Sequence, residues 1–367
     1  MTKKVALRFA GFGYEWNEVK LGEVTDIKTG GRDVQDSVED GLYPFYIRSE
    51  EVKRINSYSF DGEAILIPGE GRLGEIFHYA NGKFDVHQRV YRISNFTDVN
   101  AKFILQQMKK DFKRHAMRNT VKATVDSLRL PTIQSFTLFV PSLPEQTAIG
   151  SFFQDIDQLI SLQQRKLEVF KEQKKTYLKL LFSAKGQTKP ALRFAGFEDE
   201  WTSVLLGDIS ELYQPKTISS EDLLTEGFPV FGANGYIGYY KDYNHKENQV
   251  TISARGEGTG TPSFVEGPVW ITGNSMVVNV EKQDNITKPF LYAFCLSFDF
   301  KPFVTGGAQP QLTREVLKKV NIMLPSLPEQ EAIGSFFQDL DKAIAKQEEK
   351  VNQLKERKQT LLRKMFI

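Results

Sequence analysis

Basic side chains form the densest group of chemically active residues in this 367-residue chain. From Lys102 to Lys122 there are seven Lys and Arg residues and one Asp, so the segment carries a net charge of +6. Such a cluster is typical of a surface that binds the phosphates of a nucleic acid. The alternative, which the sequence leaves open, is the solvated face of a helix.

Residues 183–324 have a different charge balance, with 13 Lys and Arg residues against 16 Asp and Glu residues, a net charge of −3. No basic surface is evident there, so any nucleic-acid contact would depend on local groups. The candidates are Asn234, Lys241, Arg255, Asn274, Gln309 and Gln311. Asn and Gln can read adenine and Arg can read guanine, but these residue types are also common in ordinary loops.

The stretch GEGRLG at residues 69–74 matches the pattern G-x-G-x-x-G and follows the strand-like AILIP. A dinucleotide site needs a helix that opens at this loop, whereas EIFHYANGKF is broken by Asn81 and Gly82. Glu75 stands where a P-loop has its lysine. We predict a tight turn here and in ARGEGTG at residues 254–260, with close approach to a ligand backbone as the alternative.

No pattern of residues indicates catalysis or a bound metal. The four histidines, at positions 78, 87, 115 and 245, lack the spacing of metal ligands. No G-x-S-x-G nucleophile motif is present. The single cysteine, Cys295, excludes a disulfide framework and a cysteine-rich metal site. We therefore expect no catalytic residue, metal or cofactor in this chain, which argues against a stand-alone nuclease or methyltransferase.

The composition indicates packed globular domains, with 40% hydrophobic and 12% aromatic residues and a net charge of only +2. The N-terminal MTKKVALRFAGF lacks the apolar core of a signal peptide, and no run approaches the roughly 18 apolar residues of a membrane span. We expect a soluble cytoplasmic protein without membrane contact.

An internal repeat organises the chain. ALRFAGF occurs at Ala6 and Ala191, and PSLPEQTAIGSFFQDID at Pro141 returns as PSLPEQEAIGSFFQDLD at Pro325, with 15 of 17 positions identical. The segments between these flanks diverge strongly. A shared scaffold that presents two different surfaces is therefore predicted.

The repeat divides the chain into two variable domains, residues 1–140 and 186–324, and two conserved helices, residues 141–185 and 325–367. Short strands without a regular strand and helix alternation favour an α+β fold for each variable domain. The expected strands are Ala64–Ile67, Val90–Ile93, Phe136–Val140, Val250–Ser253 and Met276–Val280, and the expected helices are 101–117 and 288–297.

Each conserved segment has the features of a helix start. Pro144 and Pro328 suit a first helical turn, and Glu145 and Glu329 place negative charge at the positive end of the helix dipole. An apolar stripe follows in both copies and includes Leu159. The packing residues on the two stripes are Ile149, Phe152, Ile156, Gln163, Leu167, Phe170, Ile333, Phe336, Leu340, Gln347, Val351 and Leu354.

This stripe predicts a coiled coil. Residues 145–182 would form a helix of about 57 Å, longer than a domain of this size easily covers, so two equal helices are natural partners. The expected fold is two pseudo-symmetric domains separated by two long helices that pair antiparallel. Docking of each helix on its own domain is the alternative.

Gln163 and Gln347 occupy equivalent positions within the stripe. Polar residues there cost stability but can fix the register of a coiled coil. We hypothesise that the two side chains meet or nearly meet. Loose packing with both glutamines wetted is equally compatible with the sequence.

LRFAGF followed by EW and KLGEV, the stretches YPFY and FPVFGANGYIGYY, GGAQPQL at Gly306, and PSLPEQ leading into AIGSFFQDLD resemble the specificity subunit of type I restriction-modification systems. The resemblance covers essentially the whole chain in order. It departs in the first domain, where TVKATVDSL at Thr120 replaces the GGAQPQL type, so the contact chemistry there is expected to differ.

The resemblance implies two target recognition domains, each reading half of a bipartite site on double-stranded DNA. It implies that the helices set the spacer and dock two methylation subunits, which bind S-adenosylmethionine and methylate adenine. Restriction subunits that use ATP and Mg²⁺ are further expected partners. A coiled-coil scaffold that binds proteins without touching DNA is the alternative function, and the acidic second domain is its main support.

Under this interpretation, lysines and arginines bind phosphates and polar side chains read base edges in the major groove. The target adenine would then flip into the partner's pocket. Residue type and loop position suggest these first-domain contacts: Arg48, Lys53, Arg54, Arg72, Arg89, Arg118 and Lys122.

Overall fold

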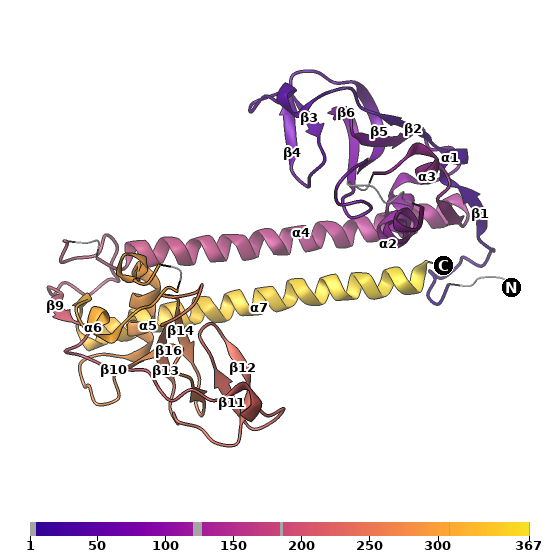
Figure 1. Cartoon of the computed structure of the whole chain (residues 1–367). Helices are drawn as coiled ribbons and strands as arrows, with labels where there is room; N and C mark the ends of the chain where they lie inside the picture. Colours follow the sequence, from indigo (N-terminus) through magenta and orange to yellow (C-terminus); the bar gives the residue numbers. More distant parts are fainter. Residues whose placement is uncertain (1–4, 120–126, 184–185, 308, 367) are drawn as a thin grey trace. The chain divides into compact units, whose positions relative to one another are not determined.

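The computed structural model describes residues 5–119, 127–183, 186–307 and 309–366 (Figure 1). The chain forms two compact units. The first unit comprises Met1–Gln164 together with Glu349–Ile367, and the second comprises Arg165–Glu348. Both long helices, α4 (Leu143–Leu180) and α7 (Leu327–Met365), therefore contribute to both units. The four-part division drawn from the repeat stays a prediction.

The first unit is built on a six-stranded sheet with the order β2-β7-β5-β6-β3-β4, beside a two-stranded pair β1-β8. Its strands are β1 (Asn17–Lys20), β2 (Asp26–Thr29), β3 (Tyr43–Tyr46), β4 (Val52–Ile55), β5 (Phe60–Pro68), β6 (His78–Val86), β7 (Val90–Ser94) and β8 (Thr137–Val140). Its shorter helices are α1 (Leu21–Val24), α2 (Ala101–Asn119), α3 (Leu130–Gln134) and the 3-10 turn η1 (Val34–Asp36).

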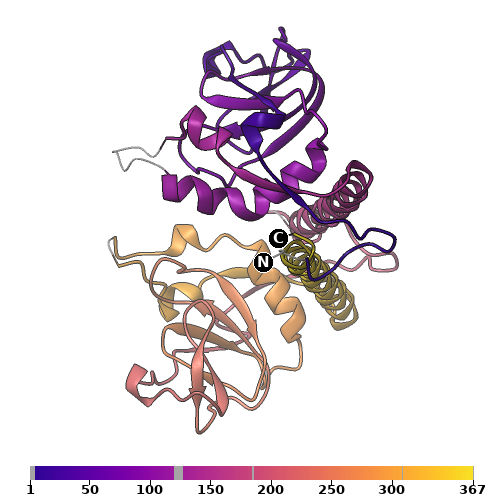
Figure 2. The same cartoon turned by 90° about the vertical axis from the view of Figure 1, so that its right-hand side faces the viewer.

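Strand β5 is buried on both faces, which explains its continuous apolar run AILI. Ile65 and Ile67 pack with Phe103 and Phe112 of α2, the helix that lies along one face of the sheet (Figure 2). The alternate side chain Leu66 points to the opposite face and packs among a smaller cluster around β6 and β7. The strand thus separates two layers of core.

The second unit repeats this plan with smaller sheets, of order β10-β16-β13-β14, β12-β11-β15 and β17-β9. Its strands are β9 (Thr202–Leu205), β10 (Glu211–Tyr213), β11 (Phe228–Phe231), β12 (Tyr236–Tyr240), β13 (Gln249–Ser253), β14 (Pro262–Val265), β15 (Trp270–Ile271), β16 (Ser275–Asn279) and β17 (Asn321–Leu324). Its shorter helices are α5 (Lys288–Ser297), α6 (Arg314–Leu317), η2 (Ser220–Asp222) and η3 (Lys301–Phe303).

Most sequence-based assignments are confirmed. The predicted strands fall within β5, β7, β8, β13 and β16 with end shifts of one residue or a few, and the predicted short helices coincide with α2 and α5. Both glycine-rich stretches form turns between strands, where Gly71 and Gly256 have φ values of 83° and 86°. An α+β fold is therefore confirmed for each half of the repeat.

The two duplicated motifs contact each other within each unit. Arg8 of the first LRFAGF donates from Nε and Nη2 to the two carboxylate oxygens of Glu145, at 2.6 Å each. Arg193 makes the same bidentate pair with Glu329 at 2.7 Å. The carboxylates are only 1% and 0% exposed. Glu145 therefore does more than complement a helix dipole, because it anchors the N-terminal segment to the start of α4.

A buried glutamine completes each anchor. Gln146 Nε2 donates to the carbonyl oxygen of Pro141 at 2.9 Å, and its Oε1 accepts from the backbone N–H of Asn100 at 2.9 Å. Gln330 repeats these contacts with Pro325 at 2.9 Å and Thr287 at 3.0 Å. Each PSLPEQ segment is thus fixed to the loop that precedes the helix of its own domain. Its Glu and Gln side chains serve internal packing.

In both units α4 and α7 pair antiparallel. In the second unit, Lys171 pairs with Glu348 and Lys174 pairs with Asp341, each at 2.5 Å. Later residues of α4 therefore contact earlier residues of α7, as in an antiparallel pair. In the first unit, Phe153 and Phe366 lie 5.8 Å apart between ring centroids, and Asp157 pairs with Lys358 at 2.5 Å. The antiparallel pairing predicted from the stripe is confirmed within each unit.

The predicted packing residues divide between helix pairing and domain cores. Ile149 and Ile333 are buried in the cores of the first and second units. Val351 and Gln347 are 4% and 6% exposed. The remaining predicted positions are half-buried: Phe152, Ile156, Gln163, Leu167, Phe170, Phe336, Leu340 and Leu354. Gln163 lies in the first unit and Gln347 in the second, and their proposed meeting stays a prediction.

One expectation about the stripe requires correction. Leu159 is 41% exposed, so it does not pack against the partner helix as the stripe predicts. Phe153 and Phe337, which the predicted stripe did not include, are buried at 0% and 2% exposure. These phenylalanines pack in the cores of the domains. The first turns of each long helix therefore contact their own domain as well as the other helix.

Each domain core also receives the end of the other long helix. Leu362, Met365 and Phe366 pack in the core of the first unit, and Leu181 and Phe182, just after α4, pack in the core of the second. Docking on the home domain and helix pairing are therefore combined. Of the helices in the described ranges, none is long and apolar enough to cross a membrane.

The anchors yield a first prediction. Glu145→Gln should destabilise the first unit by about 3 kcal/mol, because Arg8 then keeps its charge without a carboxylate in a largely buried site. Hydrogen exchange read by mass spectrometry should show faster exchange in residues 5–20 and 141–153. Glu168→Gln, at an exposed position of α4, is the matched control. Equal protection in both variants would contradict a stabilising role for the pair.

The Asp157 contact yields a second prediction. Burial alone would raise the pKa of Asp157, but attraction by Lys109 and Lys358 outweighs it and the pKa lies below its ordinary value. Burial, together with repulsion by Lys109, lowers the pKa of Lys358. Asp157→Asn should therefore destabilise the first unit by about 2 kcal/mol at pH 7.

This destabilisation should depend on pH. A carboxyl whose folded pKa is depressed stabilises the fold above its unfolded value of about 3.9, and loses that contribution as the pH falls through the folded pKa. The difference between wild type and Asp157→Asn, measured by urea unfolding, should be constant near neutral pH and shrink below about pH 4. A difference that does not change with pH would show that the charge on Asp157 contributes nothing.

Candidate nucleic-acid interface

Four loops of the first unit meet at one end of the six-stranded sheet. We call residues 47–51, 69–74, 87–89 and 127–128 the first loop cluster. Gly69 N donates to the carbonyl oxygen of Arg89 at 2.8 Å, and Leu128 N donates to the carbonyl oxygen of Gly69 at 2.8 Å. Glu70 and Ser127 form an isolated antiparallel bridge beside this link. Three of the four loops are therefore joined by backbone contacts, which leaves their side chains available to face outward.

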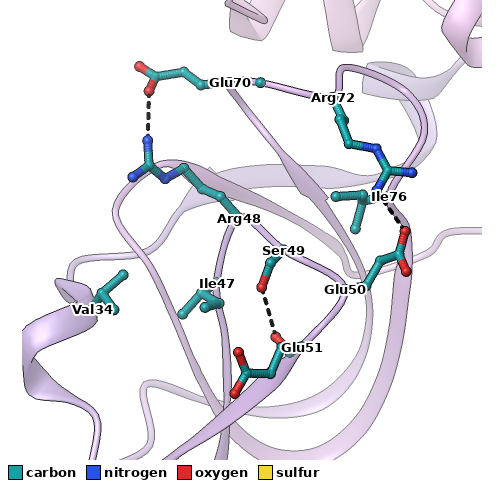
Figure 3. Close-up of a pocket in the computed structure, with 10 residues that line it drawn as sticks. Val34, Ile47, Arg48, Ser49, Glu50, Glu51, Glu70, Arg72 and Ile76 are labelled. Carbon is teal, nitrogen blue, oxygen red and sulfur yellow. Dashed lines mark hydrogen bonds and ion pairs between the residues drawn. The ribbon is translucent and has the colours of Figure 1, made fainter. Parts of the chain in front are cut away.

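Glu70 joins two of the predicted contact residues. Its carboxylate accepts from Arg48 Nη1 at 3.2 Å and from Arg89 Nη1 (Figure 3 shows the pair with Arg48). Arg48 and Arg89 have about half of their side-chain surface exposed, whereas Glu70 is 23% exposed. The three side chains carry a net charge of +1, with both guanidinium groups held near the surface.

Arg72 lies across the same region and has two carboxylate partners. It donates from Nη1 to Glu50 (Figure 3) and from Nε to Glu75, each at 2.9 Å. Its hydrogen bonds with Glu75 and Glu50 raise the pKa of Arg72. Lys113 of α2, together with Arg72, lowers the pKa of Glu75. Arg72 is thus a charged surface group already balanced by neighbouring acids.

A hollow of about 720 Å³ lies between these side chains. The polar lining consists of Arg48, Ser49, Glu50, Glu51, Glu70 and Arg72, with Val34, Ile47 and Ile76 as its apolar part (Figure 3). Three carboxylates and two guanidinium groups leave a formal charge of −1. Such a lining suits donors and acceptors on base edges better than a simple cradle for phosphate.

The buried side chain of His87 stabilises the first loop cluster. It is 2% exposed, and its Nδ1 accepts from the backbone N–H of Arg89 at 3.0 Å. Burial, assisted by repulsion from Arg48, lowers the pKa of His87, so the ring is neutral at pH 7. A neutral imidazole holds the turn that carries Arg89 without adding a buried charge.

The second unit has a corresponding set of loops. We call residues 232–235, 254–261, 272–274 and 305–312 the second loop cluster; residue 308 lies outside the described residues. Arg255 and Gln311 form an isolated antiparallel bridge, and Thr259 Oγ1 donates to the carbonyl oxygen of Pro310 at 3.2 Å. The side-chain amide of Asn234 lies close to Gly258, where an added Cβ would stand 2.2 Å from Asn234 Oδ1 and displace it.

Five of the six second-domain candidates meet in this cluster. They are Asn234, Arg255, Asn274, Gln309 and Gln311. Lys241 lies elsewhere, at the opposite end of the β11-β12 hairpin from the turn with Asn234, and its Nζ is 5.9 Å from the ring centroid of Tyr240. The structure thus gathers most of the amide and guanidinium groups predicted from the sequence.

The remaining first-domain candidates are more dispersed. Arg54 donates to the carbonyl oxygens of Gly41 and Leu42 at 2.9 and 3.1 Å, and Lys53 pairs with Glu51 at 3.4 Å. Arg118 is exposed in the last turn of α2. Lys122 lies outside the described residues. Arg54 therefore fastens the loop before β3, a structural contact that the residue type alone did not reveal.

Four cations in the described part of the basic segment at residues 102–122 have carboxylate partners. Lys109 pairs with Asp157 at 3.2 Å and Lys113 with Glu75 at 2.6 Å. Asp111 accepts from Lys110 and Arg114 at 2.9 and 2.7 Å. Asp111 is already counted in the net +6, and Asp157 and Glu75 are shared with Lys358 and Arg72. The pairs therefore hold these four side chains in place without removing the positive charge of the segment, which stays a phosphate-binding candidate.

Sequence reasoning missed the acidic members of the site. Glu50 and Glu70 determine how the arginines lie, but neither has a spacing or motif that distinguishes it from other surface acids. In the described residues, no group of three or more His, Cys, Asp or Glu side chains is arranged to hold a metal ion.

A family of known proteins matches both halves of the repeat. The family described as "Type I restriction modification DNA specificity domain" matches residues 14–172 and 198–356, one copy for each half of the repeat. The chain therefore belongs to this family of specificity subunits, whose role is to recognise the DNA target.

Individual relatives agree with this assignment. The chain is 25% identical over 338 residues to a putative type I specificity subunit of Mycoplasma pneumoniae, covering 88% of each. It is 33% identical over 136 residues to the EcoDI specificity subunit of Escherichia coli, covering 37% of this chain and 30% of that one. The crystal structure of an S subunit from M. genitalium has the same fold, with a TM-score of 0.77, 19% identity and coverage of 100% and 99%.

Arg48 and Arg89 of the first loop cluster yield a third prediction. Arg48→Ala combined with Arg89→Ala should weaken duplex DNA binding by the assembled complex. It should also make the dependence of log K on log salt shallower by about one to two units, because two positive charges near the DNA are lost and fewer counterions are released on binding. Lys28→Ala, at an exposed position of the edge strand β2 and outside the first loop cluster, is the control. Fluorescence anisotropy at several salt concentrations measures both slopes, and an unchanged slope would remove these arginines from the interface.

Proposed function

We propose that this chain is the sequence-reading subunit of a type I restriction-modification complex, in which each domain reads one half of a bipartite target on double-stranded DNA. One observation carries the proposal. Two units with the same buried anchors present loop clusters of different side chains. This is the arrangement expected of a protein that reads two different half-sites with one scaffold.

The helices are proposed to set the distance between half-sites and to dock two methylation subunits. Nearly identical helix starts suit two copies of one partner. Each start also exposes a large apolar side chain, Leu143 at 48% and Leu327 at 40%, although Glu145 and Glu329 beside them are buried. These twin leucines are suitable contacts for a repeated partner surface.

Catalysis is assigned to the partners. The methylation subunits would hold S-adenosylmethionine and methylate an adenine flipped out of the duplex, while restriction subunits would use ATP and Mg²⁺. A solved structure with TM-score 0.54 and 15% identity, titled for complex assembly of the type I system, is compatible with such partners. The complex would act in the cytoplasm.

A scaffold that binds only proteins remains the competing function, because residues 183–324 carry a net charge of −3. The second loop cluster argues against it. Asn234, Arg255 and Gln311 converge there, and amide and guanidinium groups are the side chains that read base edges. A scaffold that binds only proteins would not need polar side chains to gather in the second loop cluster, at the position equivalent to the first loop cluster of the other domain.

A fourth prediction tests the proposal directly. Co-expression with the cognate methylation subunit should give N6-methyladenine at a bipartite motif with a fixed gap, as mapped by single-molecule sequencing. Replacing residues 202–324 with the corresponding domain of another family member should change one half of the motif only. Replacing residues 17–140 should change the other half. A change in both halves, or in neither, would contradict the division of recognition between domains.

A further inference from the structure

The two loop clusters share one backbone framework. In the first, Gly69 donates its N–H to the carbonyl oxygen of Arg89 and accepts from Leu128 N, both at 2.8 Å. In the second, Ala254 donates to the carbonyl oxygen of Asn274 at 2.9 Å and accepts from Leu312 N at 3.0 Å. The numbering offsets are 185, 185 and 184, the same as those of the repeat. The loops are therefore equivalent position by position, although their sequences differ.

Three side-chain positions stand beside this framework in each domain. They are Glu70, Arg89 and Ser127 in the first, and Arg255, Asn274 and Gln311 in the second. The bridges Glu70 with Ser127 and Arg255 with Gln311 fix two of the three. Framework residues such as Ala254 and Leu312 are buried, whereas all six side-chain positions are exposed or half-buried. We call these the three reading positions.

The chemistry at the reading positions differs between the domains. The first has a carboxylate, a guanidinium and a hydroxyl, and the second has a guanidinium and two amides. Glu70 stands at the backbone position equivalent to Arg255, so the charge carried at this position is reversed between the domains. A difference confined to exposed side chains on a shared frame is what two related readers of different sequences require.

The state of the two arginines also differs. Arg89 is bound by Glu70, which also holds Arg48. In the part of the chain that the structure describes, the side chain of Arg255 makes no hydrogen bond or ion pair, whereas Arg193 and Arg314, the other arginines of residues 186–324, pair with Glu329 and Glu315. An exposed guanidinium on a loop fixed by backbone bonds is free to bind a ligand.

We propose, on the basis of the function proposed above, that these three positions determine the sequence that each domain reads, and that Arg255 recognises a guanine in the second half-site. A guanidinium matches the O6 and N7 acceptors of guanine with two parallel hydrogen bonds in the major groove. Asn274 and Gln311 lie on the same frame and carry amides, which pair with the N6 and N7 edge of adenine. Glu70 acts as a positioning residue for Arg89 in the first half-site.

The experiment uses the complex of the full chain with its methylation subunit and a pool of randomised duplex DNA. Duplexes retained by wild type and by Arg255→Gln are sequenced. We expect Arg255→Gln to lose preference at one base pair of one half-site, with discrimination falling roughly tenfold to a hundredfold. The other half-site and the gap should be unchanged. Arg255→Lys, which keeps the charge without the bidentate fork, should lose the same preference while retaining more overall affinity.

Two variants serve as matched controls. Arg314→Gln removes an equally charged, exposed arginine of the same domain that pairs with Glu315, and should select the wild-type sequence. Glu70→Gln should alter selection in the opposite half-site from Arg255→Gln, because it releases Arg89. Co-purification of the methylation subunit with every variant establishes that the complex is assembled.

The outcomes distinguish a wrong assignment of the reading positions from a wrong proposed function. Selection of the wild-type sequence by Arg255→Gln would overturn the assignment of the reading positions and leave the proposed function intact. Changes in both half-sites from one substitution would also overturn it. A wild-type complex that retains duplexes without any sequence preference would overturn the proposed function itself, and the assignment with it.

Discussion

The bidentate contact between a buried glutamate and an arginine from a distant motif is the constraint on which the rest of this structure depends. A carboxylate that is 0–1% exposed is strongly destabilising unless it is paired. Glu145 and Glu329 can therefore be buried at the helix starts only if Arg8 and Arg193 are present. This explains why LRFAGF and PSLPEQ recur together although more than a hundred residues separate them. The anchor also fixes where each long helix leaves its domain.

Once the helix starts are fixed, the helix ends complete the cores. Phe366 packs against Phe103 and Phe153 in the first unit, with ring centroids 5.1 and 5.8 Å apart. Phe182 packs against Phe290 and Phe337 in the second, at 5.6 and 6.2 Å. Each core thus needs residues from both helices, so a change of helix length or register would disturb packing in both units. The helices act as structural members of the domains and as connections between them.

The elements that were predictable from the sequence are those whose signals are local. Alternating or continuous apolar runs gave β5, β7 and β13, and a proline in the first turn with a long stripe gave α4 and α7. The failures concern long-range contacts. Leu159 has the right spacing but faces outward, and Phe153 is buried because of a domain surface that periodicity does not describe. Glu70 resembled any surface acid until the fold placed it between Arg48 and Arg89.

The separation between backbone framework and exposed side chains explains how recognition can change without loss of the fold. The framework hydrogen bonds of Gly69 and Ala254 involve only backbone atoms, so the side chains at the reading positions contribute little to them. Substitutions there alter the exposed chemistry while the backbone bonds keep the loops in place and the anchors at Glu145 and Glu329 hold the helix starts. A residue such as Arg255 is therefore free to vary with the target, whereas Arg8 and Arg193 are not. Specificity and stability reside in different residues of the same repeat.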